Sequence, residues 1–379
     1  MLIGVPTEIK AQEFRVGMTP AGVRELVAAG HRVLVQSGCG AAIGLGDDLY
    51  RAAGGSVIDT AEEIFATTDL IVKVKEPQES ECRQLRPGQL LFTYLHLAAD
   101  PKQAEHLIAS GATCIAYETI TSLQGGLPLL APMSLIAGRL SVQAGAHHME
   151  NHQGGSGTLL GGVPGVPPGK VLVLGGGVVG NSAIRVAMGM GADVTVVDRS
   201  VPRLTELDEQ YGGRLKTVYS TAEAIDQCAR EADLIVGAVL IPGASAPKLV
   251  TRNMLSHLKP RTVLVDVAID QGGCFATSHP TTHAEPTYLI DGIVHYCVAN
   301  MPGAVARTAT MALTHATLPY VLRLAAEPLV TLMSTDPHFG AGINVHAGLV
   351  THEAVAQALS REYVPLGQAL NATPHLRSA

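Results

Sequence analysis

The feature that most constrains the fold of this chain is a glycine pattern between an apolar run and a helix-like stretch. Gly175, Gly177 and Gly180 directly follow the strand candidate at 171–174. In a βαβ unit the first such glycine permits the tight turn, the second lets a pyrophosphate approach the backbone, and the third lets helix and strand pack closely. The helix N-terminus adds N–H donors and partial positive charge. The pattern therefore predicts a dinucleotide-binding site.

An acidic residue lies where this unit would contact a ribose. The next strand candidate, 194–197, ends at Asp198, eighteen residues beyond Gly180. A carboxylate there accepts from the ribose 2′-OH and repels a 2′-phosphate, which favours NAD over NADP. Arg199 and Arg203 lie nearby, so tolerance of a phosphate stays open. A glycine-rich turn in an unrelated α/β domain is the alternative to the whole interpretation.

Strand-like runs alternate with helix-like stretches along most of the chain, which is typical of βαβ units and a mostly parallel sheet. At 379 residues, the chain is too long for one ordinary core. We expect an α/β protein with two Rossmann-like, doubly wound parallel-sheet domains flanking a cleft. After residue 300 we expect two helices, at 308–332 and 351–359, and an irregular tail that packs on the first domain. The predicted domains are 1–130 plus 307–379 and 131–306.

Composition excludes several classes of protein. The net charge of −7 argues against nucleic acid or an anionic membrane as a partner. The sequence shows neither a signal-peptide pattern nor an apolar window long enough to cross a membrane, so we expect a cytoplasmic protein. The six cysteines form no C-x-x-C pair and the fifteen histidines show no ligand spacing, so we expect free thiols and no metal.

Four charged or titratable residues follow strand candidates, where open parallel sheets bind ligands. Arg15 follows the first strand, Lys75 and His96 follow two later ones, and Asp270 follows the strand at 263–267. Arginine and lysine can hold a carboxylate, histidine can exchange protons near neutral pH, and aspartate can orient a neighbour or stabilise positive charge. The ordinary alternatives are a solvated loop charge for Arg15, a surface lysine for Lys75, a core histidine for His96 and a turn cap for Asp270.

Several longer stretches are similar to one enzyme family. They are 1–10 (MLIGVPTEIK), 15–20 (RVGMTP), 73–77 (KVKEP), 91–99 (LFTYLHLAA), 132–134 (PMS), 162–166 (GVPGV), 238–243 (AVLIPG), 265–273 (VDVAIDQGG) and 298–303 (VANMPG). In their order and spacing the chain resembles the alanine dehydrogenases of the alanine dehydrogenase and pyridine nucleotide transhydrogenase family. The resemblance implies NAD-dependent, reversible oxidative deamination of L-alanine to pyruvate and ammonia, usually by a homohexamer.

The resemblance also implies roles for individual residues. Arg15 and Lys75 hold the substrate carboxylate and carbonyl, and His96 and Asp270 are catalytic. Gly17 stands where the family often has alanine, and His279 stands where some members have a basic NAD contact, so that contact is not assigned. Besides the three glycines, the implied NAD contacts are Ser134, Val178, Val179, Asp198, Ser220, Val239, Leu240, Val267, Ala268, Ile269, Asp270, Val298, Ala299, Asn300 and Met301.

The sequence is also compatible with three other functions to different degrees. The nucleotide-binding module of a proton-pumping transhydrogenase resembles the same family, but its equivalents of Lys75, His96 and Asp270 are other residue types. An enzyme for glycine with glyoxylate, or for another small 2-amino acid, is hard to separate by sequence, because one methylene contact changes selectivity by only ~1–3 kcal/mol. A non-catalytic NAD-binding protein is disfavoured by the presence of all four residues.

Overall fold

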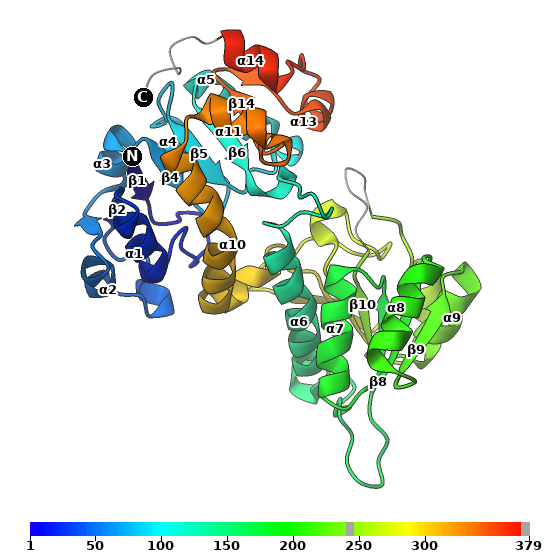
Figure 1. Cartoon of the computed structure of the whole chain (residues 1–379). Coiled ribbons are helices and arrows are strands. Elements are labelled where there is room, and N and C mark those ends of the chain that lie inside the picture. Colours follow the sequence, from blue (N-terminus) through cyan, green and yellow to red (C-terminus); the bar gives the residue numbers. More distant parts are fainter. Residues whose placement is uncertain (240–245, 373–379) are drawn as a thin grey trace. The chain divides into compact units, whose positions relative to one another are not determined.

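The computed structural model, which describes residues 1–239 and 246–372, divides into two compact units (Figure 1). The first unit combines Met1–Met133 with Val305–Ala379, and the second is Ser134–Ala304. The boundaries expected from the sequence, 130/131 and 306/307, differ from these by three and two residues. Each unit is an α/β fold built on one predominantly parallel sheet, as predicted.

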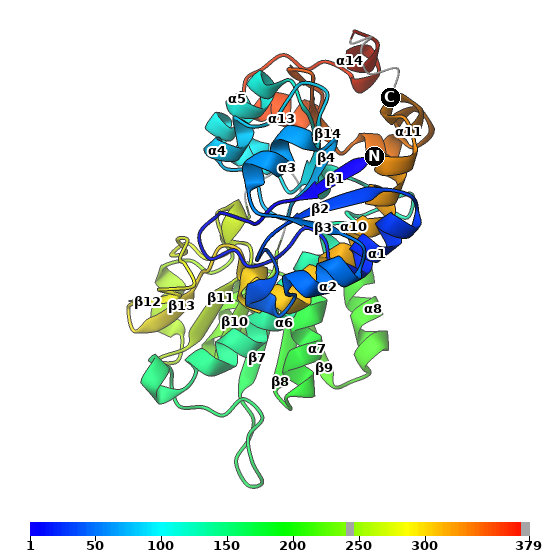
Figure 2. The same cartoon turned by 90° about the vertical axis from the view of Figure 1, so that its left-hand side faces the viewer.

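The first unit contains an eight-stranded sheet in the order β15-β14-β6-β5-β4-β1-β2-β3. Its first six strands are parallel, and their order 3-2-1-4-5-6 is that of a doubly wound fold. Figure 2 shows β1, β2 and β3 lying side by side. The strands are β1 (Leu2–Val5), β2 (Arg32–Gln36), β3 (Ser56–Ile58), β4 (Leu70–Val72), β5 (Leu90–Thr93), β6 (Thr113–Ala116), β14 (Ile343–His346) and β15 (Leu349–Val350).

The first helix of this unit begins at the residue that its capping signal indicates. Thr19 accepts a hydrogen bond from the Gly22 N–H at 3.2 Å, and Pro20 takes the first helical position of α1. Leu91, Ile71 and Leu107, all fully buried, belong to an aliphatic core on this sheet. The helices are α1 (Pro20–Ala28), α2 (Asp47–Ala52), α3 (Ala61–Thr67), α4 (Glu79–Cys82), α5 (Pro101–Ser110), α10 (Ala306–Ala326), α11 (Leu329–Thr335), α12 (Pro337–Gly340), α13 (Glu353–Ala358) and α14 (Leu366–Ala372).

The second unit repeats the doubly wound order. Its sheet has the order β12-β13-β11-β10-β7-β8-β9, in which only β12 runs antiparallel to its neighbour among the described strands. The strands are β7 (Lys170–Leu174), β8 (Asp193–Asp198), β9 (Leu215–Tyr219), β10 (Leu234–Gly237), β11 (Val263–Asp266), β12 (Thr287–Ile290) and β13 (Ile293–Tyr296). The helices are α6 (Ala131–His148), which starts in the first unit, α7 (Val178–Gly189), α8 (Val201–Tyr211) and α9 (Ala222–Glu231).

The region after residue 300 differs from the prediction of two helices and an irregular tail. The expected helix at 308–332 is interrupted at Pro328, so that α10 and α11 are separate helices. Glu327, which directly precedes Pro328, is extended, as the residue before a proline tends to be, whereas Pro319 is accommodated inside α10. The segment between the two expected helices, where no strand was predicted, contains the hairpin β14–β15, and β14 pairs with β6 to extend the first sheet. This strand was missed because Asn344 and His346 interrupt its apolar residues, so it lacks the continuous apolar run that marks β1 and β5.

Candidate active site

The first candidate residue, Arg15, is buried in the loop between β1 and α1. Its guanidinium donates to both carboxylate oxygens of Glu13, from Nε at 2.7 Å and from Nη2 at 2.6 Å, and Nη1 donates to Met133 Sδ at 3.2 Å. Burial alone would lower the pKa of Arg15, but the hydrogen bonds and charge of Glu13 outweigh it, so the pKa is raised. Arg15 is therefore a fixed cation, and the alternative of a solvated loop charge is wrong.

The second candidate, Lys75, follows β4 in a segment whose backbone is tied down on both sides. The Thr93 hydroxyl donates to the Lys75 carbonyl at 3.0 Å, and the Tyr94 N–H donates to the Val74 carbonyl at 3.2 Å. The Lys75 side chain is 14% exposed, and its Nζ lies 3.4 Å from Glu76 Oε2. An ammonium group in this position is largely screened from water, unlike an ordinary surface lysine.

A buried charge cluster that the sequence pattern did not reveal lies directly before Lys75. Lys73 is fully buried, with Nζ 3.0 Å from Glu8 Oε2 and 2.7 Å from Glu81 Oε1. Glu8 also accepts the Val74 N–H at 2.6 Å. Burial raises the pKa of Glu8 in spite of the adjacent Lys73. The cluster joins the loop after β1 to the end of β4, and the spacing of its members along the chain gave no sign of it.

The third candidate, His96, follows β5 and has an unusual backbone. It adopts the left-handed conformation, with φ of 51° and ψ of 36°, which is costly for a residue with a side chain. The His96 N–H donates to Glu118 Oε1 at 2.6 Å, and the Leu95 N–H donates to the same carboxylate at 3.2 Å. The imidazole is 45% exposed, and its Nδ1 lies 3.9 Å from Glu118 Oε1. His96 is therefore not a buried core histidine.

These three side chains follow β1, β4 and β5, which are consecutive neighbours in the first sheet. Their loops leave from the carboxyl ends of the strands, as the rule for open parallel sheets predicts. Glu118, which holds the His96 backbone, lies two residues beyond the adjacent strand β6. The same rule, applied to that strand, would have identified Glu118 from the sequence.

The glycine loop of the second unit has the close contacts expected of a dinucleotide fingerprint. Gly175 has φ of 96°, which suits glycine, and a Cβ built on Gly180 would lie 1.8 Å from the Gly175 carbonyl oxygen. A Cβ built on Gly177 would meet no described atom within 4 Å, so its backbone faces open space at the N-terminus of α7. This open surface beside helix N–H groups can hold a pyrophosphate.

Asp198, the last residue of β8, is already positioned beside that loop. Its carboxylate accepts the Gly176 N–H at 2.7 Å and the Ser200 N–H at 2.8 Å. Arg203 donates from Nε to the Gly176 carbonyl at 2.7 Å and pairs with Glu206. Asp198 can accept a ribose hydroxyl here, which fits NAD.

The remaining predicted NAD contacts lie mostly after other strands of the same sheet. Ser220 follows β9, Val239 follows β10, 267–270 follow β11 and 298–301 come after β13. Ser134 is the exception, because it lies on α6. Leu240 lies outside the described residues. The sheet edge predicted to bind the cofactor therefore carries most of these residues, and their contacts with NAD stay a prediction.

Asp270, the fourth candidate, lies in the 3₁₀ turn Ile269–Gln271 directly after β11. Its side chain is exposed. The turn is closed by the N–H groups of Gln271 and Gly273, which both donate to the Ala268 carbonyl, at 2.9 and 3.0 Å. Asp270 is thus presented to solvent on a tightly bonded turn.

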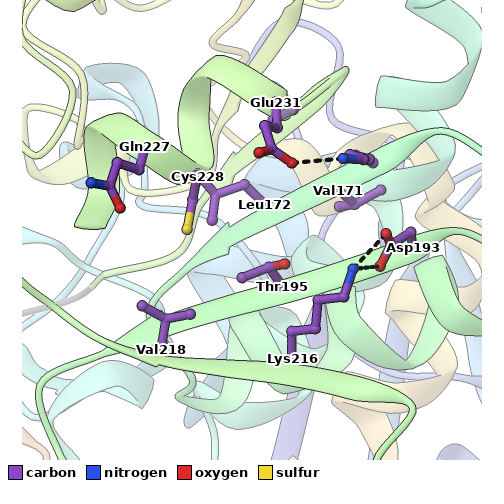
Figure 3. Close-up of a pocket in the computed structure, with 11 residues that line it drawn as sticks. Val171, Leu172, Asp193, Thr195, Lys216, Val218, Gln227, Cys228 and Glu231 are labelled. Carbon is purple, nitrogen blue, oxygen red and sulfur yellow. Dashed lines mark hydrogen bonds and ion pairs between the residues drawn. The ribbon is translucent and has the colours of Figure 1, made fainter. Parts of the chain in front are cut away.

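A cavity of about 270 Å³ in the second unit does not coincide with any of these residues (Figure 3). It lies near the amino ends of β7, β8 and β9, beside α9. Two ion pairs border it, Lys170–Glu231 and Lys216–Asp193, each at 2.6 Å. Ligands of doubly wound sheets bind at the opposite, carboxyl ends, so we do not assign this cavity to the active site.

Among the described residues, no cluster of three or more His, Cys, Asp or Glu side chains is arranged to hold a metal ion. Within that part of the chain, no helix is both long and apolar enough to span a membrane.

Comparison with known proteins agrees with this arrangement. The alanine dehydrogenase/PNT N-terminal domain matches residues 4–137, and the C-terminal domain of the same family matches 141–353. The chain is 60% identical to an alanine dehydrogenase of Halomonas elongata over 96% of this chain and 98% of that one, and 50% identical to that of Bacillus subtilis over 98% of each.

Solved structures give the same result. An L-alanine dehydrogenase with 50% identity superposes with a TM-score of 0.92, over 95% of this chain and 99% of that one. A transhydrogenase from Sinorhizobium meliloti, with 24% identity, shares the fold with a TM-score of 0.80, over 93% of this chain and all of that one. The two matched domains cover most of the sequence, and the chain belongs to the alanine dehydrogenase/PNT family.

Proposed function

We propose that this chain catalyses the reversible, NAD-dependent oxidative deamination of L-alanine to pyruvate and ammonia. The observation that carries the proposal is identity of 50–60% to curated alanine dehydrogenases over nearly the whole length of both chains. The charged side chains after β1, β4 and β5 support it, because they suit a small anionic substrate. Hydride acceptance is the chemistry that NAD supplies when bound.

Substrate binding is the role of Arg15 and Lys75 in this proposal. Glu13 accepts hydrogen bonds from Nε and Nη2 of Arg15 and thereby orients the guanidinium. Lys75 provides an ammonium group that is shielded from water, where its attraction for the carboxylate or carbonyl of the substrate is stronger than at an open surface. Together the two side chains hold the substrate in one orientation.

Proton transfer is the role of His96, with Asp270 as the second catalytic group. Alanine first gives up one ammonium proton to solvent, and loss of hydride from Cα then leaves an iminium. Water adds to the iminium to give a carbinolamine, which loses ammonia and leaves pyruvate. His96 takes a proton from the attacking water and returns one to the departing nitrogen. The net reaction consumes one water and releases one proton together with the ammonium ion, so the exposed imidazole also exchanges protons with solvent.

Cofactor binding is the role of the glycine loop and Asp198. The space at Gly177 and the N-terminus of α7 suit the pyrophosphate, and the carboxylate of Asp198 suits the ribose hydroxyls.

We also propose a cytoplasmic homo-oligomer, a hexamer by family resemblance. Leu159, Val163 and Val166 support association, because each is more than half exposed. Light scattering of the purified protein measures its mass in solution.

The test is the appearance of NADH absorbance when the protein is mixed with NAD and L-alanine at alkaline pH. Glycine, L-serine, lactate and NADP serve as alternative reactants. His96→Ala should lower kcat by about 10²–10⁴-fold, the usual contribution of a general acid–base. His106→Ala, on helix α5 of the same unit, is the matched control and should leave kcat unchanged. NAD binding without reduction by any of these substrates would contradict the proposal.

A further inference from the structure

A second aspartate, Asp266, lies beneath the turn that carries Asp270. Asp266 is the last residue of β11, and its side chain has no exposed surface. Burial raises the pKa of this carboxyl group, although the hydrogen bonds it accepts act in the opposite direction. No role was predicted for it from the sequence. Burial of a carboxyl group costs free energy unless the group is fully hydrogen-bonded, so the donors around Asp266 indicate its role.

Four donors converge on this carboxylate, and all come from the segment that follows β11. Oδ1 accepts the Ala268 N–H at 3.2 Å and the Cys274 N–H at 3.1 Å. Oδ2 accepts the Phe275 N–H at 3.2 Å and the Ser278 hydroxyl at 2.5 Å. The carboxylate thus bonds the backbone on both sides of the turn at 269–271 and fixes where that turn begins and ends.

The carbonyl groups of the same segment are held from another direction. Lys248 donates from Nζ to the carbonyls of Gly272 and Gly273, and the Ala246 N–H donates to the Gln271 carbonyl at 2.9 Å. The packing around the carboxylate is close, because a Cβ built on Gly273 would lie 2.5 Å from Asp266 Oδ2. Gly273 also has φ of 78°, so two independent reasons favour glycine there.

We infer that Asp266 is a positioning residue that holds the segment 267–270 in the conformation needed for NAD binding and hydride transfer. The inference rests on the proposed function, since it assumes that Asp270 is catalytic and that 267–270 contact the cofactor. Asp266 acts through the backbone and touches neither reactant. The carboxylate suits this role because it has only acceptor sites, and four donors face it.

Replacement by asparagine keeps the shape of the side chain and changes its hydrogen bonding. One acceptor oxygen becomes an NH₂ donor, which would face N–H or O–H groups that are themselves donors. The turn can then relax only by moving away from the side chain. Displacement of a catalytic group by about 1 Å can cost about 10²-fold in rate. We therefore expect Asp266→Asn to lower kcat by about 10- to 100-fold and to leave the KM for alanine within about threefold of wild type.

The test compares Asp266→Asn with Asp233→Asn in the same unit. Asp233 also accepts a backbone N–H, from Lys170 at 2.8 Å, and pairs with Lys259, but it directly precedes the amino end of β10. Both variants should lower the melting temperature. Asp266→Asn alone should weaken NADH binding, measured by fluorescence titration, and speed hydrogen exchange across 267–275 in the cofactor-free protein. Asp233→Asn should leave kcat and that exchange unchanged.

Ser278→Ala is a milder variant that removes one of the four donors, and it should give an intermediate loss of kcat. It keeps the inference testable if Asp266→Asn does not fold. Wild-type kcat, NADH affinity and exchange in both variants would overturn the inference. If wild-type protein reduces no NAD with alanine, the proposed function fails, whereas faster exchange and weaker NADH binding in Asp266→Asn would still support the positioning role.

Discussion

Replacement of Gly180 by alanine tests the dinucleotide site through a steric contact that the structure defines. The added Cβ would lie 1.8 Å from the Gly175 carbonyl oxygen, and real Cβ atoms essentially never come within 3.0 Å of such an atom. The turn and the start of α7 must therefore separate by at least 3.0 − 1.8 = 1.2 Å. Neither partner can rotate away, because the contact is with backbone.

Two consequences follow from that separation. Forced overpacking of this kind should lower the free energy of unfolding by about 1–3 kcal/mol. Displaced N–H groups at the N-terminus of α7 should lose one charge-assisted hydrogen bond to the pyrophosphate, worth about 1.5–3 kcal/mol, so NADH should bind about 10- to 100-fold more weakly. Denaturant unfolding measures the first quantity and fluorescence titration the second.

Two other glycines make the comparison specific. Gly189 lies in the same helix, and a Cβ added there would have no described atom within 4 Å, so Gly189→Ala should stabilise the protein by about 0.5–1 kcal/mol and leave NADH affinity unchanged. Gly177→Ala has the same free space and should not impair folding, but its methyl group should hinder the pyrophosphate. If Gly177→Ala and Gly180→Ala both bind NADH like wild type, the assignment of this loop is wrong.

Three further changes test other parts of the structure. Lys73→Met leaves two buried carboxylates without their cation and should lower the free energy of unfolding in urea by about 3–5 kcal/mol. Lys216→Met, in an exposed pair, should cost at most about 1 kcal/mol. Equal losses in the two variants would refute the role of the buried cluster. Glu118→Ala releases the left-handed backbone of His96 and should lower kcat about tenfold or more, with Glu118→Gln milder; an unchanged kcat would refute it. Burial lowers the pKa of His346 below 6.5, so the contribution of His346 to stability is complete above pH 6.5 and is lost as the pH falls toward the folded-state pKa. His346→Gln should therefore make the midpoint of urea unfolding less sensitive to acid. A midpoint that depends on pH as in wild type would contradict this prediction.

Much of the fold could be predicted because its signals are local. The glycine pattern, the apolar strands and the Thr19-Pro20 helix start each depend on a few neighbouring residues. The hairpin β14–β15 was missed because Asn344 and His346 interrupt the apolar residues of β14, and because its pairing with β6 joins residues more than 200 positions apart. The sequence shows two prolines in the expected helix, Pro319 and Pro328, and only the second coincides with a break.

The residues of the candidate site also fall into those that the sequence predicts and those that it does not. Arg15, Lys75 and His96 were found because each follows a strand, and the structure places them after three neighbouring strands. Of the groups around them, Glu118 follows β6 and could have been found by the same rule, whereas the Lys73 cluster and the bonds of Asp266 could not. The hydrogen bond that the Ser278 hydroxyl donates to Asp266 depends on how the intervening turn folds back, which no sequence periodicity indicates.

Hydride transfer from alanine to NAD is tested most directly by following the hydrogen on Cα of the substrate. Wild-type protein would be mixed with NAD and L-alanine deuterated at Cα, and the NADH and pyruvate products would be analysed by mass spectrometry. We expect NADH that carries one deuterium, pyruvate in equal amount, and neither product with His96→Ala on the same timescale. NADH without deuterium, or no NADH from a protein that binds NAD, would contradict hydride transfer from alanine.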